Sequence, residues 1–341
     1  MLILSADGSE SQVKSADMTN TFWENKKVVV TGGAGFIGSH VSELLVSFGA
    51  RVTILDDLSN ANIRNISKIK DSARFIKGDA MDISVCKNAF KNQEILINMV
   101  AKVGGIEYNR THQADMFYDN ALLELIPLKA AQVSGITRVL MVSSACVYPH
   151  EASTPTPESE GFLNDPEPTN LGYGWAKRMG EIAARVFSDQ YGMDVAVVRP
   201  YNCYGPRDHF EDEKSHVIPA LIKRVLSGEN PVIVWGTGAQ TRSFLYVEDF
   251  ARGIVLSAEK LKANTPINLG GDEEITMLEL IDKIKKISNT SCEIILDTSK
   301  PNGSPRRKSD NTLSQKLIGF RPTVSLDEGL KRTITWYKQH L

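Results

Sequence analysis

The chain has 341 residues, of which 42% are hydrophobic, and its formal net charge at pH 7 is −2. This length can bury a substantial core in one large domain or two lobes, and the small net charge provides no field that attracts nucleic acid or anionic lipid. The four cysteines show no C-x-x-C spacing and no histidine cluster, which argues against a metal site or a disulfide scaffold and fits reduced thiols in a cytoplasmic protein. No apolar run approaches the ~18 residues of a membrane span.

Residues 1–25 are predicted to form a disordered leader ahead of the folded chain. The stretch 1–22 is polar, and its apolar segment Leu2-Ile3-Leu4 is far too short for the core of a signal peptide. Met18 offers an alternative start of the natural chain within this stretch. Ordered structure is expected from residue 26 onward.

A strand followed directly by glycines is the first functional signal. Residues 27–31 are predicted to form a short buried strand, and Gly32-Gly33-Ala34-Gly35-Phe36-Ile37-Gly38 follows with both G-x-G-x-x-G and G-x-x-G-x-x-G spacing. Residues 36–48 then carry apolar side chains at helical spacing, and a second strand over residues 51–55 ends at Asp56. Strand, glycine turn, helix, strand and acid in this order predict a dinucleotide site.

Each part of this predicted site has a physical role. The glycines let the backbone approach a pyrophosphate, and the helix N-terminus supplies amide donors and a favourable dipole. The carboxylate of Asp56 would accept hydrogen bonds from the adenosine ribose and repel a 2′-phosphate, which favours NAD over NADP. The predicted cofactor-binding residues of this segment are Gly32, Gly35, Phe36, Ile37, Gly38 and Asp56.

Beyond Asp56, short apolar runs alternate with helical segments, which predicts an α/β fold with a doubly wound parallel sheet. Ligands of such sheets gather at the carboxyl ends of the strands. Asp79 follows one strand, where its carboxylate would accept a hydrogen bond from an adenine amine or simply form a solvated turn. After Arg199 the signals become shorter, which indicates a second, smaller mixed α/β lobe. The expected strands cover residues 74–77, 95–99, 138–142 and 195–199, and the expected helices cover about 114–133 and 172–191.

Tyr173 and Lys177 are the most informative pair in the chain. Four residues apart on a predicted helix, they share one face, so the ammonium group would stabilise a phenolate and lower the tyrosine pKa from its ordinary value of ~10. Most isolated pairs of this kind are merely surface residues. The segment Ser143-Ser144-Ala145-Cys146 follows an expected strand, so its side chains should face the same crevice. Residues 150–170 are rich in Pro, Glu, Ser and Thr and form either an acidic surface loop or a mobile flap over the site.

With these motifs together, the chain resembles the extended short-chain dehydrogenases/reductases of the NAD-dependent epimerase/dehydratase family. The resemblance implies a Rossmann domain (residues 26–199 and about 240–262) with a tightly bound, recycled NAD. It also implies a smaller lobe (residues 200–239 and 263–341) for a nucleotide sugar, and a homodimer formed through the helices near 114–133 and 172–191. It rests on residues 31–38, Asp56, Asp79, Ser144, Tyr173, Lys177, Arg199-Pro200, Asn202, residues 204–206 and residues 242–244.

Shorter motifs resemble two branches of this family. Residues 101–106 and 215–220 are similar to GDP-fucose synthase, whereas residues 143–149 and 240–244 are closer to GDP-mannose 3,5-epimerase. Both branches use a cysteine at the position of Cys146 in an acid/base pair, and His216 matches the second member of that pair in the synthase. Asp56 departs from the synthase pattern, because that enzyme consumes NADPH. The implied substrate-binding residues are Lys102, Gly104, Gly105, Asn202, Arg242 and Arg306, with the two arginines at the pyrophosphate.

The resemblance implies epimerisation through a transient 4-keto sugar. Tyr173 would take the proton of the C4 hydroxyl while a hydride passes to NAD⁺, Lys177 would hold the nicotinamide ribose, and Ser144 would donate to the carbonyl oxygen. The ketone acidifies C3 and C5, which Cys146 and His216 would invert from opposite faces. We therefore expect an NAD-retaining epimerase that acts on a GDP- or UDP-hexose at C3, C5 or both.

Several alternatives remain open. A 4-epimerase needs only the serine, the tyrosine and the lysine, a keto-sugar reductase would consume NAD(P)H, and a nucleotide-sensing protein would carry out no reaction. A 4,6-dehydratase is disfavoured, because that subgroup needs an Asp-Glu pair where this chain has Ala145-Cys146. Structural alternatives also exist: Cys146 would fill space at a strand end, His216 would open a helix, and Lys102 and Arg306 would lie in solvent.

Overall fold

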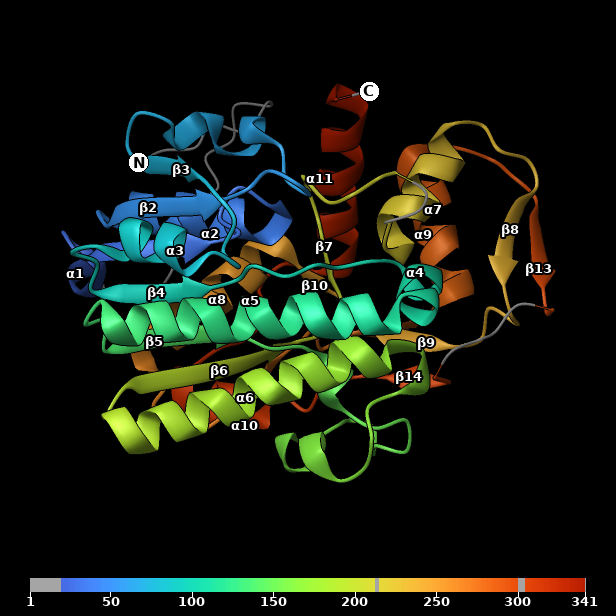
Figure 1. Ribbon diagram of the computed structural model, residues 1–341. Helices are drawn as coiled ribbons and strands as arrows, with labels where there is room; N and C mark the ends of the chain where they lie inside the picture. Colours follow the sequence, from blue (N-terminus) through green and yellow to red (C-terminus); the bar gives the residue numbers. More distant parts are fainter. Residues whose placement is uncertain (1–19, 212–214, 300–303, 341) are drawn as a thin grey trace.

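The computed structural model describes residues 20–211, 215–299 and 304–340. Seven strands of the described chain form one parallel sheet in the order β11-β6-β5-β4-β1-β2-β3, which lies between two layers of helices (Figure 1). This arrangement confirms the predicted doubly wound α/β fold, and its first six strands have the Rossmann order. The strands are β1 (Lys27–Thr31), β2 (Arg51–Asp56), β3 (Arg74–Lys77), β4 (Ile95–Asn98), β5 (Arg138–Val142), β6 (Asp194–Pro200) and β11 (Ile267–Leu269).

The central strands are continuous apolar runs because helices cover both of their faces. Residues 28–30 of β1 are fully buried, with Val28 in one core and Val29 in the other. One core packs under α3 (Ile83–Phe90), α5 (Gln113–Val133) and α6 (Leu171–Tyr191), which lie in front of the sheet in Figure 1. The opposite core packs under α2 (Phe36–Ser47), α8 (Val247–Lys260), α10 (Thr312–Ile318) and the short 3-10 helix η1 (Ile63–Ile69).

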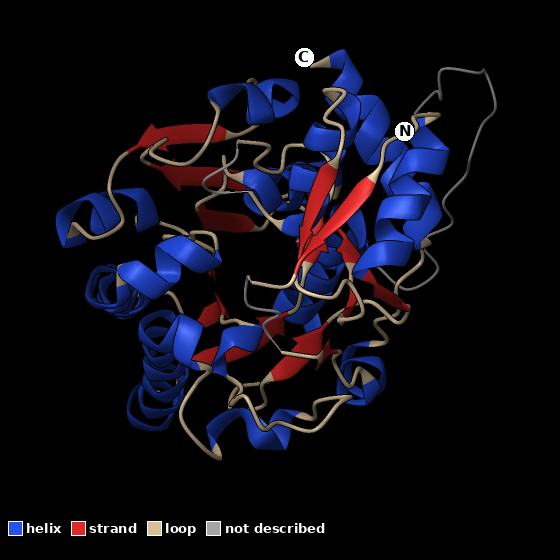
Figure 2. Ribbon diagram, turned by 90° about the vertical axis from the view of Figure 1, so that its right-hand side faces the viewer, coloured by secondary structure: helices blue, strands red, loops and turns tan. Residues whose placement is uncertain are grey.

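The smaller lobe has its own core and faces the viewer in Figure 2. Its helices are α7 (Val217–Leu226), α9 (Met277–Ser288) and α11 (Leu326–Gln339). Thr276 and Glu279 form a capping box at the start of α9, so two backbone donors are satisfied there. The remaining strands of the described chain form three small sheets: β8 (Val232–Trp235) with β13 (Ile294–Asp297); β9 (Thr241–Ser243) between β12 (Glu274–Thr276) and β14 (Arg306–Arg307); and β7 (Cys203–Tyr204) with β10 (Leu245–Tyr246).

Two predicted boundaries need correction. The predicted leader lies outside the described residues up to residue 19, but α1 (Asn20–Trp23) is helical and Trp23 is completely buried in the sheet core. The segment from residue 20 onward therefore belongs to the folded chain. Strand β11 belongs to the segment assigned to the smaller lobe, yet it pairs with β6 as the seventh strand of the main sheet. All three of its residues are buried. A strand of this length carries no sequence pattern that would assign it to the main sheet rather than to the small lobe.

The loop of residues 150–170 is anchored at its first half. The backbone of Thr156 exchanges hydrogen bonds with Lys308 (2.9 Å) and Asp310 (3.0 Å), and the carboxylate of Glu158 accepts from the amide of Asn268 (2.8 Å). These bonds tie the loop to β11 and to the segment after β14. Of the two predicted alternatives, a loop that moves as a whole does not fit these bonds. Short 3-10 helices, η3 (Glu158–Phe162) and η4 (Pro168–Asn170), shape its remainder.

Candidate active site

The turn after β1 has the shape of a pyrophosphate cradle. Gly32 has φ of +68°, and a Cβ there would lie 3.0 Å from the backbone of Val100. A Cβ on Gly38 would lie 2.0 Å from the carbonyl oxygen of Gly32, so only glycine lets the turn close onto α2. Helix α2 begins at Phe36 without a side-chain cap, which leaves the amides of its first turn for a ligand. The backbone at Gly32, Gly35, Phe36, Ile37 and Gly38 therefore fits a dinucleotide pyrophosphate.

Asp56 lies at the end of β2 beside this turn. Its carboxylate accepts hydrogen bonds from the amides of Ala34 (3.0 Å) and Leu58 (2.9 Å), and burial raises its pKa against the effect of these amides. Each carboxylate oxygen keeps a further lone pair for a ribose hydroxyl. Asp79 is exposed and accepts from the amide of Met81 (2.8 Å), which is the solvated turn of the two predicted alternatives. Its contact with adenine remains a prediction.

Tyr173 and Lys177 are both buried on the first turns of α6, so they are not a surface pair. The ammonium nitrogen lies 5.7 Å from the centre of the Tyr173 ring and donates to the carbonyl oxygen of Val142 (2.9 Å) at the end of β5. It also forms an ion pair with the carboxylate of Glu124 on α5, which sequence reasoning did not identify. The only signal for Glu124 was its place as the single charged residue in the segment 120–128.

The environment of Tyr173 differs from the simple expectation. Burial raises the pKa of its phenol, the charge of Lys177 lowers it, and Cys146 and Glu124 raise it again. A hydrogen bond with Ser144 lowers the pKa slightly, but the net direction is upward. The expected lowering by Lys177 is present, but desolvation of the phenolate is the larger effect.

Ser144 and Cys146 lie on the loop directly after β5. Ser144 caps the 3-10 helix η2 (Ala145–Val147) and its hydroxyl accepts from the amide of Cys146 (3.1 Å). Cys146 is partly exposed rather than a buried filler, and its sulfur lies 3.8 Å from a guanidinium nitrogen of Arg307. The structure therefore brings Ser144, Cys146, Tyr173 and Lys177 into one cluster, as the sequence predicted.

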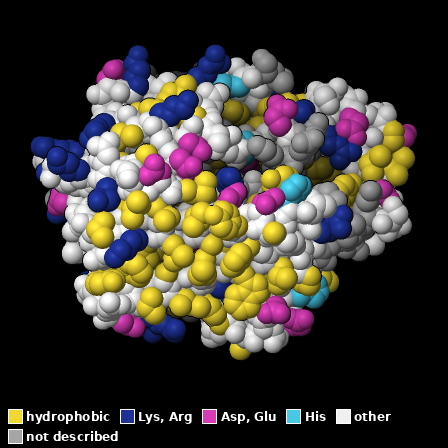
Figure 3. Space-filling model, in the orientation of Figure 1, with side chains coloured by type: hydrophobic (Ala, Val, Ile, Leu, Met, Phe, Trp, Pro, Cys, Tyr) yellow, Lys and Arg dark blue, Asp and Glu magenta, His cyan; other side chains and the backbone are white. Residues whose placement is uncertain are grey.

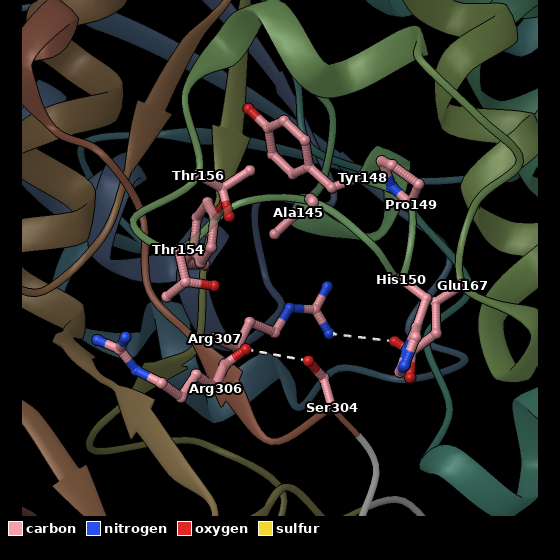
Figure 4. Close-up of a pocket in the computed structure, with 12 residues that line it drawn as sticks. Ala145, Tyr148, Pro149, His150, Thr154, Thr156, Glu167, Ser304, Arg306 and Arg307 are labelled. Carbon is pink, nitrogen blue, oxygen red and sulfur yellow. Dashed lines mark hydrogen bonds and ion pairs between the residues drawn. The ribbon is translucent and has the colours of Figure 1, made fainter.

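Arg306 and Arg307 are neighbours on β14, and their side chains point to opposite sides (Figure 4). The Arg306 side chain is 54% exposed and forms a bidentate pair with Glu274 (2.8 and 2.7 Å), which lowers the pKa of Glu274 to about 2. Arg307 instead points toward Cys146 and lies 3.7 Å from the carboxylate of Glu167. Both arginines line one pocket with Ala145, Tyr148 and His150, and the contact of Arg306 with a pyrophosphate remains a prediction. Sequence reasoning did not identify Arg307, because an adjacent pair gives no indication of which side chain faces Cys146.

Arg242 lies close to Arg307 across the strand pair β9–β14. Burial and the positive charge of Arg307 lower the pKa of Arg242 to about 10. The two guanidinium groups together with the carboxylate of Glu167, 3.7 Å from Arg307, leave a net positive charge that favours an anion. Asn202 donates to the carbonyl oxygen of Ser243 (3.0 Å) and holds the chain next to Arg242 in place.

Three further predicted substrate-binding residues lie on the loop between β4 and α4. Lys102 is half-exposed, and its ammonium pairs with Asp119 of α5 (2.7 Å). Gly104 and Gly105 precede α4 (Ile106–Thr111), and Gly105 is the residue before its first turn. Their contacts with a substrate remain predictions.

His216 occupies the position directly before α7, as one of its predicted alternatives held. Its Nδ1 lies 3.3 Å from the carboxylate of Asp208. Partial burial disfavours the charged imidazole, but the hydrogen bond and charge of Asp208 outweigh it and raise the pKa of His216. Within the residues that the structure describes, no hydrogen bond or ion pair joins His216 to Cys146.

None of the helices in the described part of the chain has the length and apolar character needed to cross a bilayer. Among the same residues, His, Cys, Asp and Glu side chains do not gather in groups of three or more that could hold a metal ion.

The parallel sheet and the glycine turn after β1 define a Rossmann-type dinucleotide-binding fold. The model of the NAD dependent epimerase/dehydratase family matches residues 28–270, and the chain belongs to this family. It is 32% identical over 339 residues to a probable GDP-L-fucose synthase 1 of Oryza sativa subsp. japonica, covering 96% of this chain and 98% of the relative. The GDP-L-fucose synthase of Escherichia coli (strain K12) is 33% identical, with coverage of 92% and 97%. The crystal structure of a Thermotoga maritima UDP-glucose 4-epimerase with UDP-glucose is similar with a TM-score of 0.84 and 28% identity, over 92% of this chain and 99% of that one.

The opposite orientations of Arg306 and Arg307 lead to a paired prediction. Arg307→Ala should weaken the binding of a nucleoside diphosphate by about 10- to 100-fold, because charge-assisted hydrogen bonds contribute roughly 1.5–3 kcal/mol. Arg306→Ala, which removes the exposed neighbour, should change affinity by less than about 3-fold. Calorimetric titration of both variants with GDP and UDP measures the difference. A larger loss in Arg306→Ala would favour Arg306 as the contact of the pyrophosphate.

Proposed function

We propose that this protein is an NAD-dependent nucleotide-sugar epimerase that inverts C3, C5 or both in a GDP- or UDP-hexose through a transient 4-keto intermediate. The observation that carries the proposal is the cluster of Ser144, Cys146 and Tyr173 around the buried ammonium of Lys177. The names of the rice and bacterial relatives and the UDP-glucose in the similar crystal structure support a nucleotide sugar as substrate.

The first stage uses the residues on α6 and the loop after β5. NAD held at the glycine turn would supply reversible hydride transfer at C4. Tyr173 removes the proton from the C4 hydroxyl, and Lys177 stabilises the phenolate that must form for this transfer. The hydroxyl of Ser144 donates to the oxygen that becomes a carbonyl, so that negative charge on this oxygen is stabilised when the proton returns.

The second stage exploits the acidity that a C4 ketone confers on C3 and C5. Cys146 removes the proton from one face of the carbon, and His216 delivers a proton to the other face. The guanidinium of Arg307 lies 3.8 Å from the sulfur of Cys146. The positive pair Arg242 and Arg307 binds the substrate pyrophosphate.

An epimerase-reductase is the second candidate, because the curated relatives named above are GDP-L-fucose synthases. It would share the first-stage residues but consume a reduced nicotinamide with each turnover. A simple 4-epimerase, the third candidate, would leave Cys146 without a chemical role.

Deuterium exchange separates these reactions. In D₂O with a panel of GDP- and UDP-hexoses, the wild type should incorporate deuterium at C3 or C5, because the inverted carbon takes its new proton from solvent. Cys146→Ala should lower this exchange by about 100-fold or more, the usual contribution of an acid/base group. Cys292→Ala, which removes a buried cysteine of the small lobe, should keep it. Turnover without exchange at either carbon supports a 4-epimerase, and net consumption of NAD(P)H supports the reductase.

The position of Asp56 supports NAD over NADP. Its buried carboxylate faces the turn at Ala34, where the charge would repel a 2′-phosphate. NAD⁺ should bind at least about 10-fold more tightly than NADP⁺, and Asp56→Ser should narrow that ratio. Calorimetry with both cofactors gives the ratio directly. Tighter binding of NADP⁺ to the wild type would contradict the proposal and favour the reductase.

A homodimer through α5 and α6 is part of the same proposal. Figure 3 shows a broad apolar area over these two helices. Apolar patches of this kind on soluble proteins mark interaction surfaces. The exposed apolar side chains of the two helices are Phe117, Tyr118, Val133, Leu171, Trp175, Ile182, Val186 and Tyr191.

Substitution of one residue in this patch tests the dimer. Ile182→Glu places a charge in the middle of the patch, so it should convert a dimer into monomers in light-scattering measurements at micromolar concentration. Leu317→Glu, on the exposed side of α10, should leave the mass unchanged. A monomeric wild type would exclude this interface.

A further inference from the structure

Glu124 is a buried carboxylate for which the reaction scheme above has no use. It lies in the middle of α5, and its side chain is only 3% exposed. Moving a charged carboxylate from water into a protein interior costs free energy. A buried carboxylate is therefore retained only where it is paired and hydrogen-bonded. Here its partner is the ammonium of Lys177, which is buried to the same degree. The ion pair therefore connects α5 to the proposed catalytic cluster around Lys177.

The packing of α5 against α6 makes room for this carboxylate. Gly180 lies about one turn after Lys177 on α6, and a Cβ at that position would lie 2.9 Å from both Cγ and Oε2 of Glu124. Any larger residue would push the carboxylate away from its position. The glycine on one helix and the acid on the other thus form a matched pair.

The contacts of Lys177 explain what the carboxylate does. An ammonium group has three N–H donors. One is directed to Glu124 and another to the carbonyl oxygen of Val142 at 2.9 Å. With two donors fixed from different sides, the third is left for the phenol oxygen of Tyr173 or a hydroxyl of the cofactor ribose.

A second buried carboxylate on the same helix pair provides a contrast. Glu181 follows Gly180, but it accepts hydrogen bonds from Arg199 (2.9 and 2.7 Å) and from Ser143 (2.5 Å). Its charge is thus neutralised by a different partner, on the side of β6. The two buried acids therefore have different cationic partners, Lys177 for Glu124 and Arg199 for Glu181.

We propose that Glu124 is a positioning residue that orients Lys177 and tunes the proton affinity of Tyr173. This role rests on the proposed function of Tyr173 as the base. The groups that face the phenol are Lys177 of α6, Cys146 of η2 and Glu124 of α5, and Glu181 additionally faces Glu124. Among them, Glu124 and Cys146 raise the pKa of Tyr173, and Lys177 lowers it.

Removal of the negative charge of Glu124 should lower the pKa values of both Tyr173 and Lys177. Without Glu124, the charge of Lys177 would act on the phenolate unopposed, so the pKa of Tyr173 would fall. The pKa of Lys177 would fall as well, because Glu124 is the largest influence that raises it against burial. Both titrations therefore move to lower pH. The carboxylate keeps the ammonium charged and correctly oriented, at the expense of a less acidic tyrosine.

The test measures the ionisation of Tyr173 without any substrate. The near-ultraviolet absorbance of phenolate is followed against pH in the full chain, and Tyr173→Phe in each background isolates the contribution of this tyrosine. Glu124→Gln should lower the midpoint by about 1 pH unit, the effect of one nearby charge. Glu181→Gln, the matched loss of a buried acid from the same helix pair, should leave the midpoint at its wild-type value.

Steady-state kinetics give a second measurement. Glu124→Gln should move the acidic limb of the kcat profile to lower pH and reduce kcat while KM stays near the wild-type value, since Glu124 does not reach the sugar site. An unchanged Tyr173 midpoint in Glu124→Gln, or an equal shift in Glu181→Gln, would overturn the proposal.

Folding defects and failure of the proposed function remain distinguishable. If Glu124→Gln does not fold, Glu124→Met decides: it removes the charge with a side chain of similar length, so a midpoint shifted to lower pH supports the proposal and a wild-type midpoint refutes it. If the wild type turns over no nucleotide sugar, the proposed function fails, whereas the absorbance titration still reports on Glu124.

Discussion

The ammonium group of Lys177 is buried between α5, α6 and the end of β5, and the geometry of the site depends on how its charge is satisfied. An unpaired charge at this depth would cost several kcal/mol, and loss of one partner of a buried pair costs about 3–5 kcal/mol. Glu124 and the carbonyl oxygen of Val142 satisfy it from two directions. As a result, one group of contacts links α5 and α6 to the end of β5 beside the ring of Tyr173.

A second network holds the loop that carries Ser144 and Cys146. Glu181 of α6 binds Arg199 of β6, which also donates to the hydroxyl of Tyr148 (3.0 Å), and Tyr148 donates to Asn268 of β11 (2.6 Å). The loop after β5 is therefore held at both ends by buried hydrogen bonds. Because Asn268 of β11 is part of this network, the seventh strand anchors the loop that carries Ser144 and Cys146.

Local patterns predicted much of the fold and part of the site. The strand, glycine turn and helix of residues 27–48 were recognisable because each step has its own signature: an apolar run, glycines where a Cβ would clash, and helical spacing of apolar side chains. Tyr173 and Lys177 were recognisable because a four-residue separation on a helix places two side chains on one face. Glu124 was not, because its partner lies 53 positions away in the chain and only the packing of α5 on α6 brings them together.

The sequence by itself therefore determined the order of elements, the glycine turn and the chemical types of the clustered side chains, since all of these follow from neighbours along the chain. Tertiary structure decided which charges meet. Arg307 rather than Arg306 points toward Cys146 because of the way β14 pairs with β9, and β11 joins the main sheet because β6 presents an open edge to it. Burial decided the proton affinities as well, because desolvation depends on everything packed around a group and not on the residues beside it in sequence.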